Sequence, residues 1–244
     1  MALNPMHQFE VYKIGPDINL GGVNLSFTNA SLFMVLSSLL ILSMLFIGTK
    51  KRALIPSKIQ LITEMSYTFV AKMISETAGS KAKSFFPFIF TLFMFVLFCN
   101  MVGMLPYSFT VTSHIIVTFV LAAIIFVGVT IIGFIKHGIR YLELFVPKGV
   151  PIVLLPIIVV IEIISYLSRP VSLSVRLFAN MMAGHTMLKV FGGFVISLGL
   201  LGGWLPLGFS VALTGLEILV AFLQAYVFAI LTCIYLNDAL NLHH

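Results

Sequence analysis

The sequence contains few charged residues: only 9% of its 244 positions are Asp, Glu, Lys or Arg, whereas soluble domains carry roughly 25%. Hydrophobic residues make up 60% of the chain, and its mean hydropathy is +1.13. This composition predicts an integral membrane protein and excludes an ordinary soluble domain. Most of the basic residues behind the net charge of +6 lie between apolar runs, which fits membrane topology better than binding to nucleic acid.

Several signals of other functions are missing as well. No GxxxxGK[ST] motif occurs, so we expect no nucleotide site and no catalytic role for this chain. The two cysteines, Cys99 and Cys233, lie in apolar runs without a Cys or His at ligand spacing, and we expect both to be small buried hydrophobic residues. We therefore expect neither a metal nor a cofactor. The N-terminal segment does not resemble a signal peptide, and no internal repeat is evident.

The apolar runs in the first half predict three roughly upright transmembrane helices. The first helix fits residues 32–48, and the basic cluster that follows it marks the inner side of the membrane, with the N-terminal segment 1–31 outside. Residues 56–78 alternate apolar and polar side chains, which predicts an amphipathic helix on the inner surface. Residues 85–135 predict a helical hairpin that turns on the outer side. Basic residues flank its inner ends at Lys81, Lys83, Lys136, Arg140 and Lys148.

Residues 150–236 are almost unbroken apolar sequence and predict a hairpin of two long, strongly tilted membrane helices. A helix of about 40 residues is about 60 Å long, twice the thickness of the hydrocarbon core, so the first of the two must tilt, bend or break. Prolines inside it favour bending. The glycine-rich segment 202–206 predicts the turn. The chain is therefore expected to be a single all-α membrane domain over residues 1–244.

Arg176 lies inside the first of these long helices. A charge at the bilayer centre costs at least about 2.5–3.5 kcal/mol, and an arginine cannot escape this cost by losing its proton. Its guanidinium needs an acidic partner, a water-filled cavity or both. Arg176 is therefore predicted to be a functional residue, and a purely structural ion pair is the alternative.

Five further polar residues accompany Arg176 in this region: Glu162, Asn180, His185, Glu217 and Gln224. In an antiparallel hairpin, residues at equal depth are equally far from the turn. The pairs Arg176–Gln224 and His185–Glu217 are both centred on residues 200–201, next to the predicted turn. We therefore expect Arg176 to lie level with Gln224, and His185 to lie within reach of Glu217.

Helical phase relates these groups further. Glu162 is 14 residues before Arg176, about four turns, so both point to nearly the same side about 21 Å apart in a continuous helix. An acid, a fixed cation and a His–Glu pair, spread through the membrane, suit two proton paths separated by a positive barrier. Simpler interpretations stay open: Glu162 at the interface, His185 in the core, and Asn180 and Gln224 in helix–helix hydrogen bonds.

Three stretches resemble subunit a of the F-type ATP synthases. They are SRPVSLSVRLFANMMAGH at residues 168–185, LQAYVF at 223–228 with Glu217 one heptad earlier, and NMVGMLPY at 100–107. With the helix plan, the resemblance covers essentially the whole chain. The chain differs from well-known bacterial members in one respect. They carry an acid at the position of His185 and a histidine at that of Glu217, whereas this chain has the exchanged arrangement, as in mitochondria and some related bacteria.

The resemblance implies a stator subunit of the Fo sector. Such a subunit passes protons to and from a rotor ring of c subunits through two offset half-channels and so drives ATP synthesis. Arg176 would separate the half-channels and help to deprotonate each rotor carboxylate. His185 and Glu217 would line the outer half-channel, and Glu162 would line the inner one.

The resemblance also implies the partners and the location. Asn180 and Gln224 would lie near the c-ring contact, and the other partners would be the peripheral-stalk b subunits, the rest of the FoF1 complex and the lipid bilayer. The location would be a bacterial inner membrane or, for an organelle-encoded chain, the mitochondrial inner membrane. A self-contained proton-coupled secondary transporter is the alternative function, although such proteins usually contain internal repeats. A subunit that holds haem or quinone fits less well, because only His185 lies deep in an apolar run.

Overall fold

The computed structural model describes residues 9–15, 19–20, 23–24, 26–50, 55–105, 108–146 and 154–241. Some positions used in the sequence predictions lie outside these residues. They are Lys51 and Arg52 of the basic cluster, the end of the third motif at 106–107, and the segment 147–153 with Lys148.

The described chain is almost entirely helical, which confirms the all-α class. Its α-helices are α1 (Asn29–Lys50), α2 (Lys58–Thr77), α3 (Phe86–Gly103), α4 (Ile115–His137), α5 (Leu155–Gly202) and α6 (Trp204–Leu240). Short 3-10 helices are η2 (Ser80–Phe85), η3 (Val111–Ser113) and η4 (Gly138–Phe145), and β1 (Asn19–Leu20) pairs antiparallel with β2 (Val23–Asn24). Five helices are long and apolar enough to cross a membrane, and α2 is not one of them.

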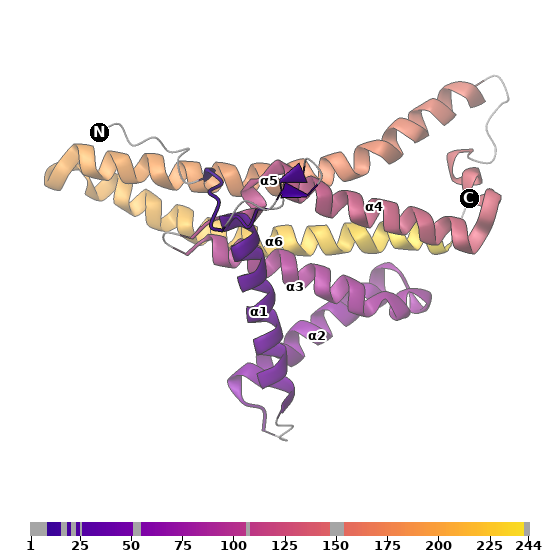
Figure 1. Cartoon of the computed structure of the whole chain (residues 1–244), viewed down its shortest axis with the longest axis horizontal. Helices are drawn as coiled ribbons and strands as arrows, with labels where there is room; N and C mark the ends of the chain where they lie inside the picture. The colour runs from indigo at the N-terminus through magenta and orange to yellow at the C-terminus, as the bar shows by residue number, and fades with distance from the viewer. Residues whose placement is uncertain are drawn as a thin grey trace.

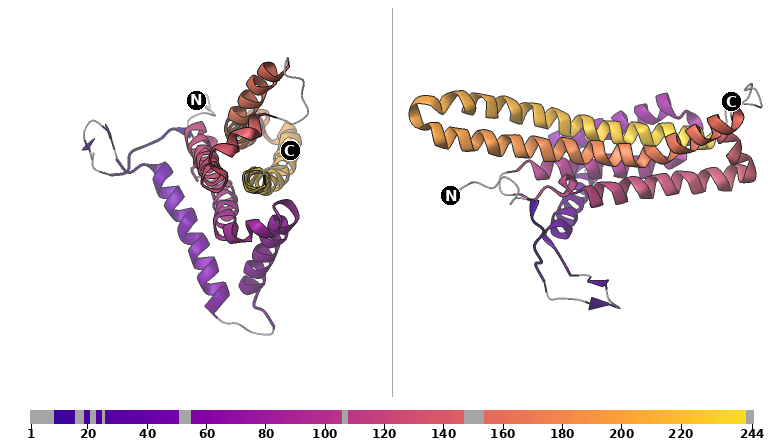
Figure 2. Two further views of the ribbon diagram at one scale, coloured as in Figure 1. Left: turned by 90° about the vertical axis from the view of Figure 1, so that its right-hand side faces the viewer. Right: turned by 90° about the horizontal axis from the view of Figure 1, so that it is seen from above.

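The two longest helices, α5 and α6, lie side by side along the longest axis of the molecule (Figure 1). Helix α4 packs along α5 and α6, and α3 packs along α6. Helix α1 runs across this direction, and α2 returns from its end toward α3, so that α1 and α2 form a V in the left view of Figure 2, where α6 is seen end-on. The upright orientation of α1, α3 and α4 in the bilayer stays a prediction. Their mutual arrangement differs from a parallel set, because α3 and α4 share the direction of the long hairpin and α1 does not.

Helix α2 has the amphipathic character expected of residues 56–78. Its start is capped by Ser57, whose side-chain oxygen accepts a hydrogen bond from the backbone N–H of Gln60 at 3.3 Å. Val70, Met73 and Ile74 recur at helical spacing and are buried against the rest of the molecule. The opposite face stays exposed, as expected for a helix that packs on one side only.

The turn of the long hairpin depends on two glycines. Gly199 has a φ of 59°, a left-handed conformation that an L side chain rarely adopts, and α5 ends three residues later. A Cβ on Gly203 would lie 2.6 Å from the carbonyl oxygen of Gly199 and 2.8 Å from that of Val195. The turn lies at Gly203, within the predicted segment 202–206, but α6 already begins at Trp204 and the helical geometry of α5 breaks earlier, at Gly199.

Small side chains allow α6 to pack closely in the centre of the molecule. Ala221, Ala225, Ala229 and Cys233 recur every four residues along α6, and each is fully buried. Small residues at this spacing let membrane helices approach one another closely. Cys99 is buried as well and both cysteines are free, so the expectation for the cysteines is confirmed.

Candidate functional site

His185 of α5 and Glu217 of α6 face each other across the long hairpin. The His185 Nδ1 atom lies 3.4 Å from Glu217 Oε1, and the two side chains are only 11% and 5% exposed. Gly184 makes this approach possible, because a Cβ at that position would lie 2.8 Å from Glu217 Oε1. The contact confirms the prediction from hairpin spacing that the two residues lie within reach of each other.

Glu217 is buried with its hydrogen-bonding capacity unused. Neither of its carboxylate oxygens makes a hydrogen bond within the described residues, and His185 is its nearest polar neighbour. Ala221 lies one turn beyond Glu217 on α6, and its carbonyl accepts a hydrogen bond at 3.1 Å from the side-chain amide of Asn100 on α3. The Asn100 Oδ1 atom has no hydrogen-bond partner within the described residues. Buried polar atoms with unused capacity are where water or a mobile proton can bind.

Asn180 and Gln224 form the next polar pair along the hairpin. The Asn180 Nδ2 atom donates to Gln224 Oε1 at 3.0 Å. The sequence placed Arg176, not Asn180, level with Gln224, so that prediction was wrong by one helical turn. The observed pair is centred on residue 202 rather than on residues 200–201, because the helical geometry of α5 already breaks at Gly199 and the two helices are not one straight, regular hairpin.

Arg176 points away from the packed interior of the hairpin. Its neighbours Ser174 and Leu177 are buried in the core, whereas Arg176 itself is exposed. Its guanidinium makes no ion pair or hydrogen bond with any residue that the structure describes. Glu162, four turns earlier, is half-buried and likewise has no polar partner in the described chain. Within the described residues, the permanent cation in the middle of α5 is therefore left without an acidic partner.

A second ionic contact, which the sequence analysis missed, joins the other ends of α5 and α6. The Arg169 Nη1 atom lies 3.2 Å from Asp238 Oδ2. The guanidinium carbon also lies 5.3 Å and 5.0 Å from the ring centres of Tyr166 and Tyr235, within the range of cation–π attraction. The equal-depth argument with its centre at residues 200–201 would not have found this pair, because Arg169 and Asp238 are centred on residues 203–204.

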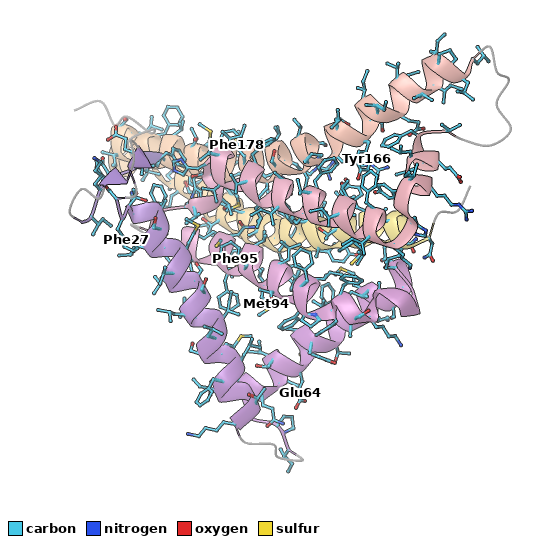
Figure 3. All side chains as sticks on the ribbon, turned by 45° about the vertical axis from the view of Figure 1, so that its right-hand side comes forward. Phe27, Glu64, Met94, Phe95, Tyr166 and Phe178 are labelled. Atoms are coloured by element: carbon cyan, nitrogen blue, oxygen red, sulfur yellow. The ribbon has the colours of Figure 1, made fainter. Side chains whose placement is uncertain are left out.

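Tyr166 connects this ionic contact to α4 and η4 (Figure 3). Its hydroxyl lies 2.6 Å from the Thr130 hydroxyl and 3.0 Å from the Tyr141 hydroxyl.

Lys189, one turn beyond His185, is the other charged residue of α5 that the sequence analysis left out. Nothing in the described chain forms a group of three or more His, Cys, Asp or Glu side chains that could hold a metal ion.

Comparison with known proteins identifies close relatives. The family model of the ATP synthase A chain matches residues 31–237. A protein of Pelagibacter ubique (strain HTCC1062) named ATP synthase subunit a is 80% identical over 244 residues, which is 100% of both chains. Proteins with the same name from Chelativorans sp. (strain BNC1) and Rhizobium rhizogenes (strain K84) are 59% and 60% identical, and each comparison covers at least 98% of both chains.

Proposed function

Because this chain belongs to the ATP synthase A chain family, we propose that it conducts protons to and from a rotor ring of c subunits through two offset half-channels. Membership of this family supports the general role of a multi-pass membrane protein that serves as the proton-transporting stator subunit of the Fo sector. The observation that supports the finer role is Arg176, a cation in the middle of a membrane helix that is exposed and has no ion-pair partner among the described residues. A cation there needs an acidic partner, and a passing rotor carboxylate would supply it.

The two half-channels would lie on opposite sides of Arg176. The buried His185–Glu217 contact would relay protons in the outer half-channel, because a histidine and a carboxylate can exchange a proton near neutral pH. Glu162 would serve the inner half-channel. Arg176 cannot carry a proton onward, since its guanidinium stays charged, so it acts as the electrostatic barrier between the two paths.

The Asn180–Gln224 pair would lie close to the rotor contact. Asn180 is exposed, is one turn from Arg176 and hydrogen-bonds to a side chain of the neighbouring helix. A neutral amide pair gives a rotor carboxylate polar contacts without capturing its proton. The partners in this proposal are the c-ring, the peripheral-stalk b subunits and the rest of the FoF1 complex. This chain itself carries out no covalent chemistry. The named relatives are bacterial, which favours a bacterial inner membrane over the mitochondrial one.

The test is ATP-driven acidification of inverted membrane vesicles that contain the whole complex. Arg176→Ala is expected to abolish acidification while leaving the complex assembled, and Arg176→Lys is expected to fail substantially, because a desolvated ammonium can lose its proton and lacks the planar fork. Val175→Ala, at the exposed neighbouring position, is the control and should pump normally. Normal acidification by assembled Arg176→Ala complexes would contradict the proposal.

A further inference from the structure

Thr110 is a buried residue in the loop between α3 and α4, and it contacts His185 from the side opposite Glu217. Its Oγ1 atom lies 3.0 Å from His185 Nε2 and 3.1 Å from the carbonyl oxygen of Gly103. The side chain is 5% exposed. A Cβ on Gly103 would lie 2.7 Å from the Thr110 methyl carbon, so the glycine lets the loop close onto the end of α3.

The number of protons decides the direction of these hydrogen bonds. A threonine hydroxyl has one proton to donate, and a backbone carbonyl can only accept. The Gly103 carbonyl lies in the last turn of α3 and has no partner within that helix. The Ser108 hydroxyl lies nearer to the Leu105 carbonyl, at 2.7 Å, than to the Gly103 carbonyl, at 2.9 Å. Thr110 therefore donates to Gly103 and accepts a hydrogen bond from His185 Nε2–H.

We propose that Thr110 is a positioning residue that holds His185 as the Nε2–H tautomer and so turns its Nδ1 atom toward Glu217 as a proton acceptor. The gap between Nδ1 and Glu217 Oε1 then holds one transferable proton. This inference rests on the proposed role of His185 and Glu217 in the outer half-channel. The loop after α3 thereby takes part in proton transfer, because its residue Thr110 contacts His185.

The proton count of the relay is balanced. In the loaded state, the proton in the gap belongs either to the Glu217 carboxyl group beside a neutral imidazole or to Nδ1 of an imidazolium beside a carboxylate. Transfer across the gap breaks one bond to hydrogen and forms the other, with no change in total charge. Release leaves the Nε2–H imidazole beside a carboxylate, ready to take the next proton. Throughout the cycle, Nε2 keeps its own proton and donates it in a hydrogen bond to Thr110 Oγ1.

Within the part of the chain that the structure describes, few other ionisable groups lie near this contact. Lys189 lies one turn along α5 from His185, and Glu217 is the ionisable group that α6 contributes. His114 begins α4, next to the loop that carries Thr110, and its ring stacks on Phe109 at 4.9 Å between centres. Burial lowers the pKa of His114, which disfavours a positive charge on its imidazole. Among the described residues, the His185–Glu217 pair and the positive charge of Lys189 therefore decide whether a proton occupies the gap between Nδ1 and Oε1.

The test compares Thr110→Val, which removes the hydroxyl and keeps the shape, with Thr110→Ser, which keeps the hydroxyl. Thr118→Val is the matched control, because the buried Thr118 hydroxyl donates only to backbone carbonyls of the first turn of α4. The complete FoF1 complex is reconstituted in proteoliposomes with the outer side facing the lumen. ATP synthesis after an acid–base transition is measured while the lumenal pH is varied and the external pH is fixed.

Thr110→Val is expected to slow synthesis roughly three- to tenfold, the range that the loss of one hydrogen bond predicts. The lumenal pH for half-maximal synthesis is expected to fall by roughly 0.5–1 unit, because a hydroxyl accepts more strongly from an imidazolium than from a neutral ring. Thr110→Ser should restore both the rate and the midpoint, and Thr118→Val should change neither. A Thr110→Val complex that behaves like the Thr118→Val control overturns the inference.

Two further measurements separate this inference from the proposed function. If Glu217→Gln leaves synthesis intact in the same assay, the outer half-channel assignment itself fails; if Glu217→Gln is impaired and Thr110→Val is not, only the role of Thr110 fails. Solid-state ¹⁵N NMR of the histidine-labelled complex, with His185 assigned by difference from a His185→Gln complex, reports the tautomer directly. A protonated Nε2 beside an unprotonated Nδ1 supports the inference, and the opposite neutral tautomer overturns it even where Thr110→Val fails to assemble.

Discussion

At the scale of single residues, the glycines next to the polar groups are as informative as the polar groups themselves. Gly184 leaves space for the Glu217 carboxylate beside His185, and Gly103 leaves space for Thr110 on the other side of the same imidazole. His185 is thus held between two partners, Glu217 from α6 and Thr110 from the loop between α3 and α4. Its environment depends on backbone positions that have no side chain, and these positions fix the distances over which a proton would move.

The His185–Glu217 contact predicts the outcome of an exchange experiment. His185→Glu and Glu217→His alone should each reduce ATP-driven acidification roughly tenfold or more, because each leaves two like groups facing each other in a buried site. The double exchange should recover a large part of the lost rate, since it restores one acid and one imidazole at the same depth and Gly184 leaves room for the ring. Acidification is measured in inverted vesicles, with assembly checked by immunoblot. Strictly additive losses in the double variant would show that the two residues do not act as a unit.

At the scale of elements, the hairpin of α5 and α6 was largely predictable from the sequence. Its turn follows from glycines that break a long apolar run, and the depth of each pair follows from its distance to that turn, which is why His185–Glu217 was found. The argument loses accuracy farther from the turn, because it assumes straight helices of equal pitch. The pairing of Asn180 rather than Arg176 with Gln224 measures this error as one turn.

Contacts from outside the hairpin were not predictable in this way. Thr110 lies 75 residues before His185, in a loop whose path no periodicity describes. Asn100 was part of a recognised motif, but its hydrogen bond to the Ala221 carbonyl depends on how α3 packs against α6. Arg169–Asp238 was missed because this pair is centred on residues 203–204, away from the predicted centre at 200–201, and because Asp238 lies beyond the predicted end of the hairpin at residue 236.

The turn itself makes a prediction about stability. Gly203→Ala would place a methyl group 2.6 Å from the Gly199 carbonyl oxygen, and overpacking of this kind typically costs about 1–3 kcal/mol. The thermal stability of the detergent-purified complex and the amount of subunit in the membrane should both fall. Gly208→Ala is the matched control on α6, because a Cβ there meets nothing within 4 Å and alanine favours the helix. Equal stability of the two variants would show that the close approach at Gly203 does not constrain the turn.

At the scale of the whole molecule, charge is distributed along α5 in a fixed order. Glu162 comes first, Arg169 is paired with Asp238, Arg176 is exposed and unpaired within the described chain, and His185 is buried against Glu217. Groups that can bind and release a proton thus lie on both sides of a guanidinium that keeps its own. Because α5 is longer than an upright span needs, we expect it to be tilted or bent in the bilayer, with this order of charges spread across the membrane.

This order predicts that substitutions on the two sides of Arg176 respond to pH on different sides of the membrane. Glu162→Gln should slow ATP synthesis in proteoliposomes several-fold without abolishing it, because water can partly replace one relay group, and Glu162→Asp should do less harm. The loss should vary with pH on the inner side and stay constant as the outer pH varies, whereas the loss in Glu217→Gln should do the reverse. Glu76→Gln, at an exposed acid on α2, is the control and should synthesise ATP normally. If Glu162→Gln leaves the rate unchanged over about pH 6–8 on the inner side, Glu162 is an interfacial residue and the inner path runs elsewhere.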